Sequence, residues 1–268
     1  MPALEDVSFE LRQGTVSGIV GHNGAGKTTL LLLIAGLKKL KHGSIEVLGS
    51  PPRSRKLISR VGILTDRLRF VPEFKVSEVV RTFSLMHRMP DKDALESFEA
   101  MDLLEHRDKY VRELSTGLRK RLGVAVAIMH KPELILLDEP FSGLDPQSVR
   151  TMTDAIQGWV KEGRTVVISS HDLPELQELI HDVVVMRERK VLATGAFLEL
   201  LRESGLTPRV HIETTAGTRD VDPDHLESEL VAVRKADEQI MRITTKGTTL
   251  ADLYLHLHQD PDAGGKAG

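Results

Sequence analysis

The chain has 268 residues, of which 40% are hydrophobic, enough for one large domain or a domain and a half around a hydrophobic core. Its formal net charge of -3 and its pI near 6.4 differ from the strongly basic balance that is typical of nucleic-acid-binding proteins. It contains no cysteine, which excludes a disulfide framework, a thiolate metal site and a cysteine nucleophile.

The start of the chain lacks a basic region followed by an apolar core, so no signal peptide is expected. The longest apolar run, Leu30 to Leu37, falls far short of the ~20 residues that are needed to cross a bilayer. Any role at a membrane is therefore expected to come through a partner protein.

The first predicted element is a half-buried, antiparallel strand over residues 7–11, where apolar and polar side chains alternate. A turn leads into a second β-prone run over residues 16–20. A helix then begins at Gly26 and stops at Gly36, and another alternating strand is predicted at residues 45–47. The chain therefore opens with a strand, a glycine-rich loop and a helix.

That loop has the spacing of a phosphate-binding loop, Gly-x4-Gly-Lys-Thr. Glycines at 21, 24 and 26 let the backbone adopt a positive φ and approach oxygen atoms without a Cβ in the way. Lys27 is placed to reach the β- and γ-phosphates of a nucleotide, and the Thr28 hydroxyl to bind Mg²⁺. The helix directs its unpaired N–H groups into the loop, so an anion is expected there; the alternative is a glycine-rich turn that caps an ordinary helix. The predicted nucleotide-binding residues are Gly21, His22, Asn23, Gly24, Ala25, Gly26, Lys27, Thr28 and Thr29.

A β-prone run at residues 61–64 precedes a long stretch with a different pattern. From Glu73 to His130 the apolar residues fall at helical spacing, which predicts an inserted helical subdomain over about residues 73–131. Its helices are expected around residues 76–86, 95–104 and 118–129.

Strands separated by short helices make up the rest of the predicted core. The uninterrupted apolar run at residues 134–137 is typical of a strand buried on both faces of a parallel sheet. Two more β-prone runs cover residues 166–168 and 183–186, with helices that start near Pro146 and Leu173. This alternation predicts an α/β fold with right-handed crossovers.

After a pause near residues 204–208, a small α+β appendage is predicted over residues 205–259, and residues 260–268 are expected to be a frayed tail. The elements expected in the appendage are a strand at residues 210–212, a helix around Leu226, strands at 231–233 and 240–243, and a helix at 250–257.

Two adjacent carboxylates, Asp138 and Glu139, follow the buried strand, at the carboxyl end where ligands of open α/β sheets usually sit. Side chains that leave a strand end next to each other point in different directions and can take different roles. Asp138 is the expected partner of Mg²⁺, and Glu139 can accept a proton from an attacking water. The alternative is a turn with a capping aspartate before Pro140.

Further polar residues follow at the ends of predicted elements. Ser142-Gly143-Leu144-Asp145 comes after the carboxylate pair, and His171 follows the strand that ends at Ser170. A lone histidine at such a place can simply satisfy a backbone group. Together with the other motifs it is expected to contact the γ-phosphate of a nucleotide.

An LSGGQ-like signature lies in the last part of the helical insert, at Leu114-Ser115-Thr116-Gly117-Leu118. With the phosphate loop before it, and with the strand ending in Asp-Glu, Ser-Gly-Leu-Asp and a switch histidine after it, the chain resembles the nucleotide-binding subunits of ABC transporters. The resemblance covers Ala3 to about Glu203. It implies a P-loop NTPase core with an antiparallel β subdomain and an inserted helical subdomain, all within an ABC-type nucleotide-binding domain over residues 1–204. Ser115 can also act as the N-cap of a helix, and both interpretations can hold.

The resemblance further implies that no single chain has a complete catalytic site. Two subunits, alike or different, close head to tail, and each ATP lies between the phosphate loop of one chain and the signature of the other. Glu139 is then the general base, His171 steadies the γ-phosphate and Asp145 communicates across the dimer. Hydrolysis opens the dimer, and the movement passes through the helical lobe to membrane-spanning partners. The signature residues are Ser115, Thr116, Gly117 and Leu118.

The chain departs from the family pattern at four places. The family usually has Gln, or Glu in some exporter-type members, where this chain has Asp66; the side chain is shorter, so contact with Mg²⁺ is expected through a bridging water. Leu118 replaces a polar residue of the signature, and His22 stands where proline is common. The aromatic residue that usually stacks on adenine belongs just before Ala3, and no aromatic is present there.

Residues 249–255 resemble the closing helix of bacterial ABC subunits that pair with separately encoded, export-type (ABC-2-like) membrane proteins, although such helices are also common as packing elements. We therefore expect the ATP-hydrolysing subunit of an ABC exporter, with ATP and Mg²⁺, peripheral on the cytoplasmic face of the cell membrane through transmembrane partners, and without nucleic acid. Two alternatives stay open. One is a soluble ABC ATPase acting on ribosomes or DNA, a class that generally shows tandem cassettes, a coiled-coil insertion or a basic surface. The other is a regulatory subunit that binds ATP without turnover. Asp66, Leu118 and the missing aromatic residue favour it slightly, and Glu139 and His171 argue against it.

Overall fold

A computed structural model of the chain describes residues 3–66, 68–206, 209–236, 238–246 and 249–259. The chain divides into two compact units, Met1–Thr194 and Gly195–Gly268. Helix α8 (Phe197–Glu203) belongs to the second unit, in which it contacts α10 (Leu250–Gln259). The domain boundary predicted after residue 204 thus falls inside this second unit and stays a prediction.

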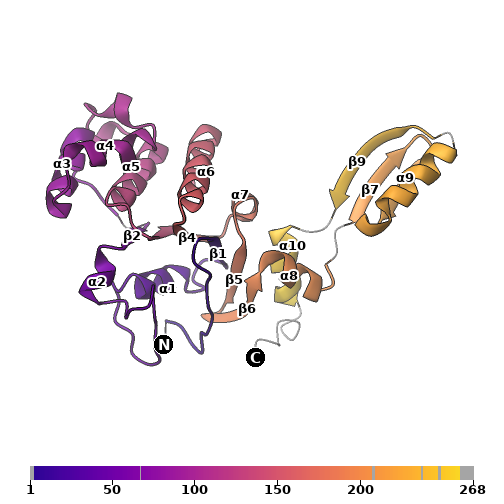
Figure 1. Cartoon of the computed structure of the whole chain (residues 1–268), viewed down its shortest axis with the longest axis horizontal. Coiled ribbons are helices and arrows are strands. Elements are labelled where there is room, and N and C mark those ends of the chain that lie inside the picture. Colours follow the sequence, from indigo (N-terminus) through magenta and orange to yellow (C-terminus); the bar gives the residue numbers. More distant parts are fainter. Residues whose placement is uncertain (1–2, 67, 207–208, 237, 247–248, 260–268) are drawn as a thin grey trace. The chain divides into compact units, whose positions relative to one another are not determined.

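The first unit is built on a six-stranded sheet with the strand order β2-β3-β4-β1-β5-β6 (Figure 1). The four pairings from β2 through β3, β4 and β1 to β5 are parallel. Every residue of β1, β3 and β4 is buried, as expected for strands covered on both faces. The predicted α/β fold is therefore confirmed. The strands are β1 (Val16–Val20), β2 (Val61–Leu64), β3 (Leu134–Asp138), β4 (Thr165–Ser170), β5 (Asp182–Arg187) and β6 (Lys190–Ala196).

The register of the sheet aligns the carboxyl ends of its central strands. Val20 at the end of β1 pairs with Ser170 at the end of β4, and Asp138 at the end of β3 pairs with Ser169. Residues that follow these strands therefore gather at one edge of the sheet. The polar motifs of the sequence directly follow these strands, so they lie at this edge.

Helices that follow the strands in sequence contact the central strands from outside. Helix α1 (Lys27–Ile34) starts at the glycine loop and contacts β3 and β4, while α6 (Pro146–Lys161) and α7 (Leu173–Gln177) contact β4. All three begin at or next to their predicted starts. The core between α1 and the sheet includes Leu31 and Leu136, both essentially inaccessible to solvent.

The helical insert contains three helices, α3 (Val76–His87), α4 (Asp91–Glu99) and α5 (Thr116–Ile128) (Figure 1). The first and third agree with their predicted ranges, whereas α4 both begins and ends before the range predicted at residues 95–104. Helix α5 is buried over most of its length because it packs against both β2 and the other two helices. It therefore connects the insert to the sheet. Shorter elements of the first unit are the helix α2 (Arg55–Ile58) and 3-10 turns at Leu104–His106 and Val111–Glu113.

The strands predicted at residues 7–11 and 45–47 are absent, although the structure describes these residues. Residues 7–11 keep the expected alternation of half-buried and exposed side chains, and Val7 and Phe9 pack on the core. The second segment contributes only an isolated bridge between Val47 and Ser50. The alternation of apolar and polar residues therefore predicted the burial of the side chains correctly. It did not make these residues a strand, because a strand also requires a neighbouring strand with which its backbone forms hydrogen bonds.

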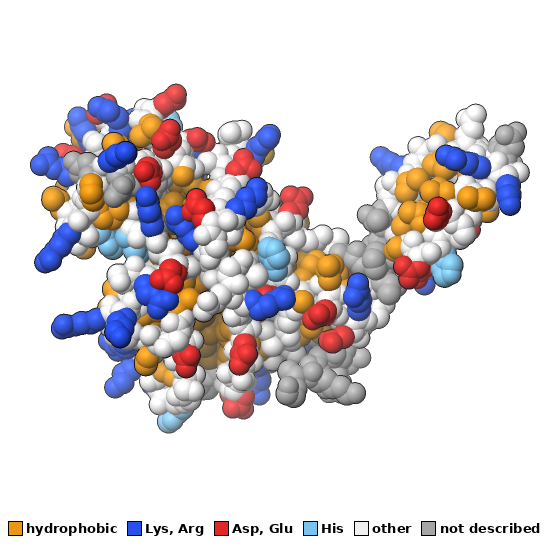
Figure 2. Space-filling model, in the orientation of Figure 1, with side chains coloured by type: hydrophobic (Ala, Val, Ile, Leu, Met, Phe, Trp, Pro, Cys, Tyr) orange, Lys and Arg blue, Asp and Glu red, His pale blue; other side chains and the backbone are white. Residues whose placement is uncertain are grey.

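The second unit contains a separate antiparallel sheet with the strand order β8-β7-β9. One helix, α9, covers the face on which Val210 and Ile212 are buried. Other apolar side chains of this unit are exposed to solvent, among them Ile240 and Met241, and apolar side chains gather over this part of the chain in Figure 2. Its elements are β7 (Arg209–Thr214), β8 (Gly217–Val221), the 3-10 turn Pro223–His225, α9 (Leu226–Lys235) and β9 (Ile240–Lys246).

The strand predicted at residues 231–233 is wrong, because these residues lie inside α9. Leu226 and Leu230, one helical turn apart, pack against the small core, and Val233 one turn further on is buried, while Val231 is 47% exposed. Strands β6 and β8 were not predicted at all. No helix in the described part of the chain combines the length and the apolar character needed to cross a lipid bilayer.

Candidate functional site

The glycine loop between β1 and α1 is shaped by two different uses of glycine. Gly24 and Gly26 have positive φ angles of 87° and 106°, and Gly26 is the N-cap of α1. Gly21 does not have a positive φ, so the predicted backbone conformation of this glycine is wrong. A Cβ at Gly21 would lie 2.6 Å from the carbonyl oxygen of Met186, which means that lack of space, not backbone conformation, requires glycine there.

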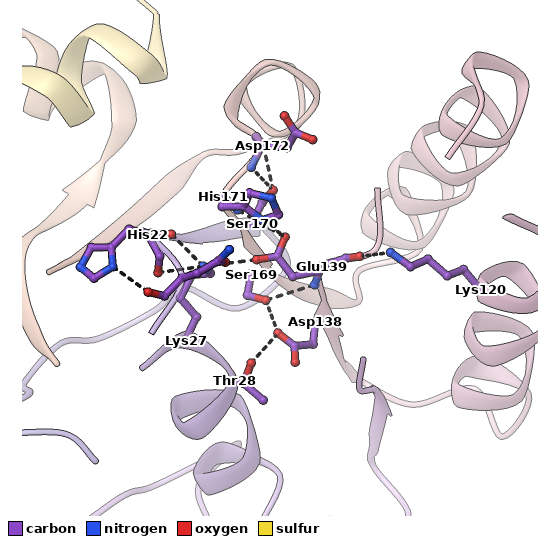
Figure 3. A network of polar contacts seen from close by, with 12 residues as sticks. His22, Lys27, Thr28, Lys120, Asp138, Glu139, Ser169, Ser170, His171 and Asp172 are labelled. Carbon is purple, nitrogen blue, oxygen red and sulfur yellow. Dashed lines mark hydrogen bonds and ion pairs between the residues drawn. The ribbon is translucent and has the colours of Figure 1, made fainter. Parts of the chain in front are cut away.

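Lys27 lies at the centre of this loop with only 6% of its side chain exposed. Its Nζ donates to the carbonyl oxygen of Gly21 at 2.7 Å and lies 3.2 Å from Oε1 of Glu139 (Figure 3). A buried ammonium group needs such oxygen partners because it has lost its hydration. The loop therefore presents a cation, together with the N-terminus of α1, to any bound anion. Next to it, the exposed His22 places Nδ1 2.8 Å from the carbonyl oxygen of Asn23.

Asp138 at the end of β3 is held by two hydroxyl groups. Its Oδ1 accepts hydrogen bonds from Ser169 at 2.5 Å and from Thr28 at 3.2 Å (Figure 3). Its Oδ2 is buried and accepts no hydrogen bond from the described residues. A buried carboxylate oxygen without a donor, beside a threonine hydroxyl, fits the oxygen ligands that Mg²⁺ prefers.

Glu139 and His171, which are 32 positions apart, are brought together in the structure. Oε2 of Glu139 lies 2.7 Å from Nδ1 of His171 and also accepts a hydrogen bond from its backbone N–H at 3.3 Å. The Glu139 side chain is 16% exposed, while the imidazole is 42% exposed. The carboxylate is thus held between the Lys27 ammonium and the His171 ring, and it still borders the open pocket.

That pocket has a volume of about 500 Å³ and joins several of the predicted segments. Asp66, which is exposed, lies in its wall with Asp138 and Glu139. Ala3 and Arg189 complete the wall and were not predicted; Arg189 lies in the turn between β5 and β6, and no motif marks it. The phosphate-loop residues in the wall are Asn23, Gly24, Ala25, Gly26, Lys27, Thr28 and Thr29.

Ser169 is a further member of the site that sequence reasoning missed. Besides donating to Asp138, its hydroxyl accepts a hydrogen bond from the backbone N–H of Glu139 at 3.2 Å. A serine at the carboxyl end of a fully buried strand, next to the strand that carries the carboxylates, was the available signal.

The signature segment lies at the N-terminus of α5 and does not line this pocket. Ser115 is the N-cap, since its Oγ accepts a hydrogen bond from the N–H of Leu118 at 3.2 Å, so its predicted capping role is confirmed. Ser115 and Thr116 are exposed, whereas Gly117 is buried. The structure therefore keeps the signature apart from the phosphate loop of the same chain.

Gly117 instead packs against the start of α6. A Cβ at this position would lie 3.0 Å from Oγ of Ser148 and 3.3 Å from Oδ2 of Asp145. Asp145 caps α6 by accepting hydrogen bonds from the backbone N–H and the hydroxyl of Ser148, at 2.9 and 2.8 Å. These hydrogen bonds, that from the backbone first, lower the pKa of Asp145 below its usual value and keep it a carboxylate.

Comparison with known sequences identifies the family of the chain. Residues 4–142 match the family model described as "ABC transporter". An uncharacterised ABC transporter ATP-binding protein of Methanocaldococcus jannaschii is 30% identical over 204 residues, which is 75% of this chain and 74% of the relative. The bacitracin transport ATP-binding protein BcrA of Bacillus licheniformis is 33% identical over 75% of this chain and 67% of its own. The Nod factor export ATP-binding protein I of Burkholderia thailandensis is 30% identical over 88% of this chain and 77% of its own.

Solved structures show the same fold. An ATP-binding subunit of an ABC transporter aligns with a TM-score of 0.69 at 22% identity, over 85% of this chain and 93% of that chain. A dimeric ATP-binding cassette in a post-hydrolysis state, bound to ADP and Pi, aligns with a TM-score of 0.66 at 22% identity, over 72% of this chain and 90% of that chain.

Proposed function

We propose that this chain, a member of the ABC transporter family and an ATP-hydrolysing subunit, powers an exporter. In this proposal it closes head to tail with a second such subunit around ATP. The observation that carries the catalytic part is the single pocket in which Lys27, Asp138 and Glu139 lie together. Relatives named for bacitracin transport and Nod factor export support the export part.

The phosphate chain of ATP lies along the loop that precedes α1. There Lys27 exchanges its contacts with the Gly21 carbonyl and with Glu139 for oxygens of the β- and γ-phosphates. This exchange also releases the carboxylate of Glu139 from the ammonium group. Binding of the substrate therefore frees the group that has to accept a proton.

Thr28 and Asp138 would hold Mg²⁺, and Asp66 would reach it through a water. Support comes from the unpaired buried oxygen of Asp138 beside the threonine hydroxyl, and from the position of Asp66 in the pocket wall. When bound, the ion neutralises charge on the β- and γ-phosphates. Ser169 fixes the other oxygen of Asp138 and so orients this carboxylate.

Glu139 acts as the general base of hydrolysis. Its carboxylate accepts a proton from a water, whose oxygen forms a bond to the γ-phosphorus while the bond between that phosphorus and the bridging oxygen of ADP breaks. His171 holds the carboxylate through Nδ1, and its exposed ring edge is available to the γ-phosphate. The products are ADP and inorganic phosphate.

The second subunit supplies the missing wall of the site. Residues 115–118 begin a helix whose free N–H groups suit a phosphate, and Ser115 and Thr116 are exposed, yet they lie outside the pocket of their own chain. In the closed dimer they face the γ-phosphate held by the partner, and Asp145 lies beside them at the start of α6. Either an identical or a different subunit can take the partner's place.

Separately encoded transmembrane subunits bind the helical insert and hold the chain on the inner face of the membrane. The test is to tag the chain in its own cells, solubilise the membranes in mild detergent and identify what is purified with it. We expect a polytopic membrane protein in a fixed ratio to the chain. Recovery only from the soluble fraction, with ribosomes, with DNA or alone, would contradict the transporter assignment of this subunit.

A further inference from the structure

Lys120 lies in the second turn of α5 and extends from the helical insert to residues 139–145, the segment after β3 that we call the catalytic segment. Its Nζ donates to the carbonyl oxygen of Glu139 at 2.7 Å (Figure 3). It also donates to the carbonyl oxygen of Ser142 at 2.5 Å. Charge-assisted hydrogen bonds of this length are among the stronger ones in proteins. One ammonium group therefore ties a helix of the insert to both ends of a short turn after β3.

The backbone that Lys120 grips is strained. Glu139 has a φ of 50°, in the left-handed region that residues with a Cβ rarely adopt. Its N–H donates to the carbonyl oxygen and to the hydroxyl of Ser169 in β4, at 3.1 and 3.2 Å. The amide before the Glu139 side chain is thus fixed by β4, and the carbonyl after it by α5.

Burial of this lysine has a cost that its contacts must offset. Desolvation lowers the pKa of Lys120, while the nearby carboxylates of Asp66, Glu139 and Asp138 raise it. An ammonium group is retained here, next to the reaction centre, although a neutral side chain would avoid the desolvation. This favours a function for the charge beyond simple packing.

We propose that Lys120 is a positioning residue, which holds the strained backbone of Glu139 so that its carboxylate stays aimed at the attacking water. The proposal rests on the assignment of Glu139 as the general base. Because α5 also begins with the signature, and Gly117 packs against Asp145, the helix is joined to the catalytic segment at residues 139, 142 and 145. A shift of the signature on the partner's ATP is therefore carried to the base of the same chain.

The deciding experiment compares Lys120→Met with Lys120→Arg in the full chain, and uses Lys161→Met as the matched control. Lys161 is exposed at the far end of α6 and loses the same charge without touching the site. ATP turnover gives kcat and KM, and a nucleotide titration gives the affinity for ATP.

We expect Lys120→Met to lower kcat on the order of 10- to 100-fold, because a base displaced by about 1 Å loses that much. KM and ATP affinity should stay within about twofold of the wild type, since the phosphate loop is untouched. Lys120→Arg, which keeps the cation, should recover much of the rate, and Lys161→Met should match the wild type.

A kcat of Lys120→Met equal to that of the wild type would overturn the proposal. So would a parallel fall of kcat and ATP affinity in a folded protein, because that pattern indicates a general structural defect. If thermal melting shows that the methionine variant is unfolded, Lys120→Gln, which keeps a neutral donor, is measured in its place against the same limits.

Glu139→Gln separates this inference from the proposed function. If that variant hydrolyses ATP like the wild type, Glu139 is not the base and both fall. If it is inactive while Lys120→Met keeps its rate, only the role of Lys120 is wrong. Adding Lys120→Met to Glu139→Gln should lower the residual rate no further, since Lys120 acts through the carboxylate that is already gone.

Discussion

The two faces of this chain that carry nucleotide motifs differ in how complete they are. In the phosphate-loop pocket, Lys27, Asp138 and Glu139 each have partners within the chain, from the loop, from β4 and from the residue after it. At the N-terminus of α5, the side chain of Ser115 serves the backbone of its own helix, and Ser115 and Thr116 are open to solvent. The polar side chains of the pocket are thus held by their own chain, whereas the exposed residues of the signature are the part that we propose meets the ATP of a partner. In the proposed dimer, a substitution in the pocket should therefore affect the ATP bound by the same chain, and a substitution in the signature should affect the ATP bound by the partner.

The largest effect is expected from Glu139→Gln, on the pocket side. Removing the proton acceptor should lower kcat by about 10²- to 10⁴-fold with ATP binding intact, because the amide keeps the size and the hydrogen-bonding reach of the carboxylate. Size-exclusion chromatography with MgATP should then show an ATP-bound dimer. Normal turnover by this variant would remove Glu139 from its assigned role.

Lys27→Ala should weaken ATP binding on the order of 10- to 100-fold, since it removes charge-assisted contacts with the phosphates. An equilibrium titration with a fluorescent ATP analogue measures this directly. Lys38→Ala is the control, because this exposed lysine follows α1 outside the pocket. Equal affinities of the Lys27 variant and the wild type would be incompatible with the phosphate-loop assignment.

Ser115→Arg tests the signature side, where the bulky cation should block the partner's ATP and abolish turnover. Mixed with Lys27→Ala chains in equal amounts, it should restore about a quarter of the wild-type rate, because random pairing makes half of the dimers mixed and each has one composite site. A mixture with no ATPase activity would mean that the two faces do not meet in a head-to-tail pair.

The smallest effects concern the glycine loop itself. Gly21→Ala should destabilise the protein by about 1–3 kcal/mol, since its Cβ meets the Met186 carbonyl at 2.6 Å. Gly24→Ala meets no atom within 4 Å and should cost only about 1 kcal/mol through its positive φ. Denaturant unfolding measures both. If Gly24→Ala proves the more damaging, crowding is not what requires glycine at position 21.

The pocket could be predicted from the sequence because its motifs follow β-prone runs, and the carboxyl ends of parallel strands meet at one edge of a sheet. Once β3 and β4 pair with Asp138 opposite Ser169, the carboxylates and His171 must converge. The contacts of Lys120 could not be predicted, because they go to backbone carbonyls and leave no pattern of residue types. The capping role of Ser115 was visible as a motif, whereas the packing of Gly117 on Asp145 depends on tertiary structure.

The secondary-structure predictions failed in segments whose hydrophobic pattern is compatible with more than one type of structure. Residues 7–11 alternate like a strand but pack on the core without a neighbouring strand. Residues 231–233 are β-prone, but they lie inside the helix α9. The side chains of Leu226, Leu230 and Val233 recur at helical spacing, and Val231 between them is exposed. In both cases tertiary packing decided between local preferences of similar strength.

The left-handed backbone at Glu139 has a meaning for the history of related genes. Glycine adopts a φ of 50° without a Cβ penalty, so selection for folding alone would favour glycine at this position. On the proposal that Glu139 is the general base, this backbone strain is kept for hydrolysis. A copy of the gene that is released from hydrolysis would therefore gain folding stability by a change to glycine at this position.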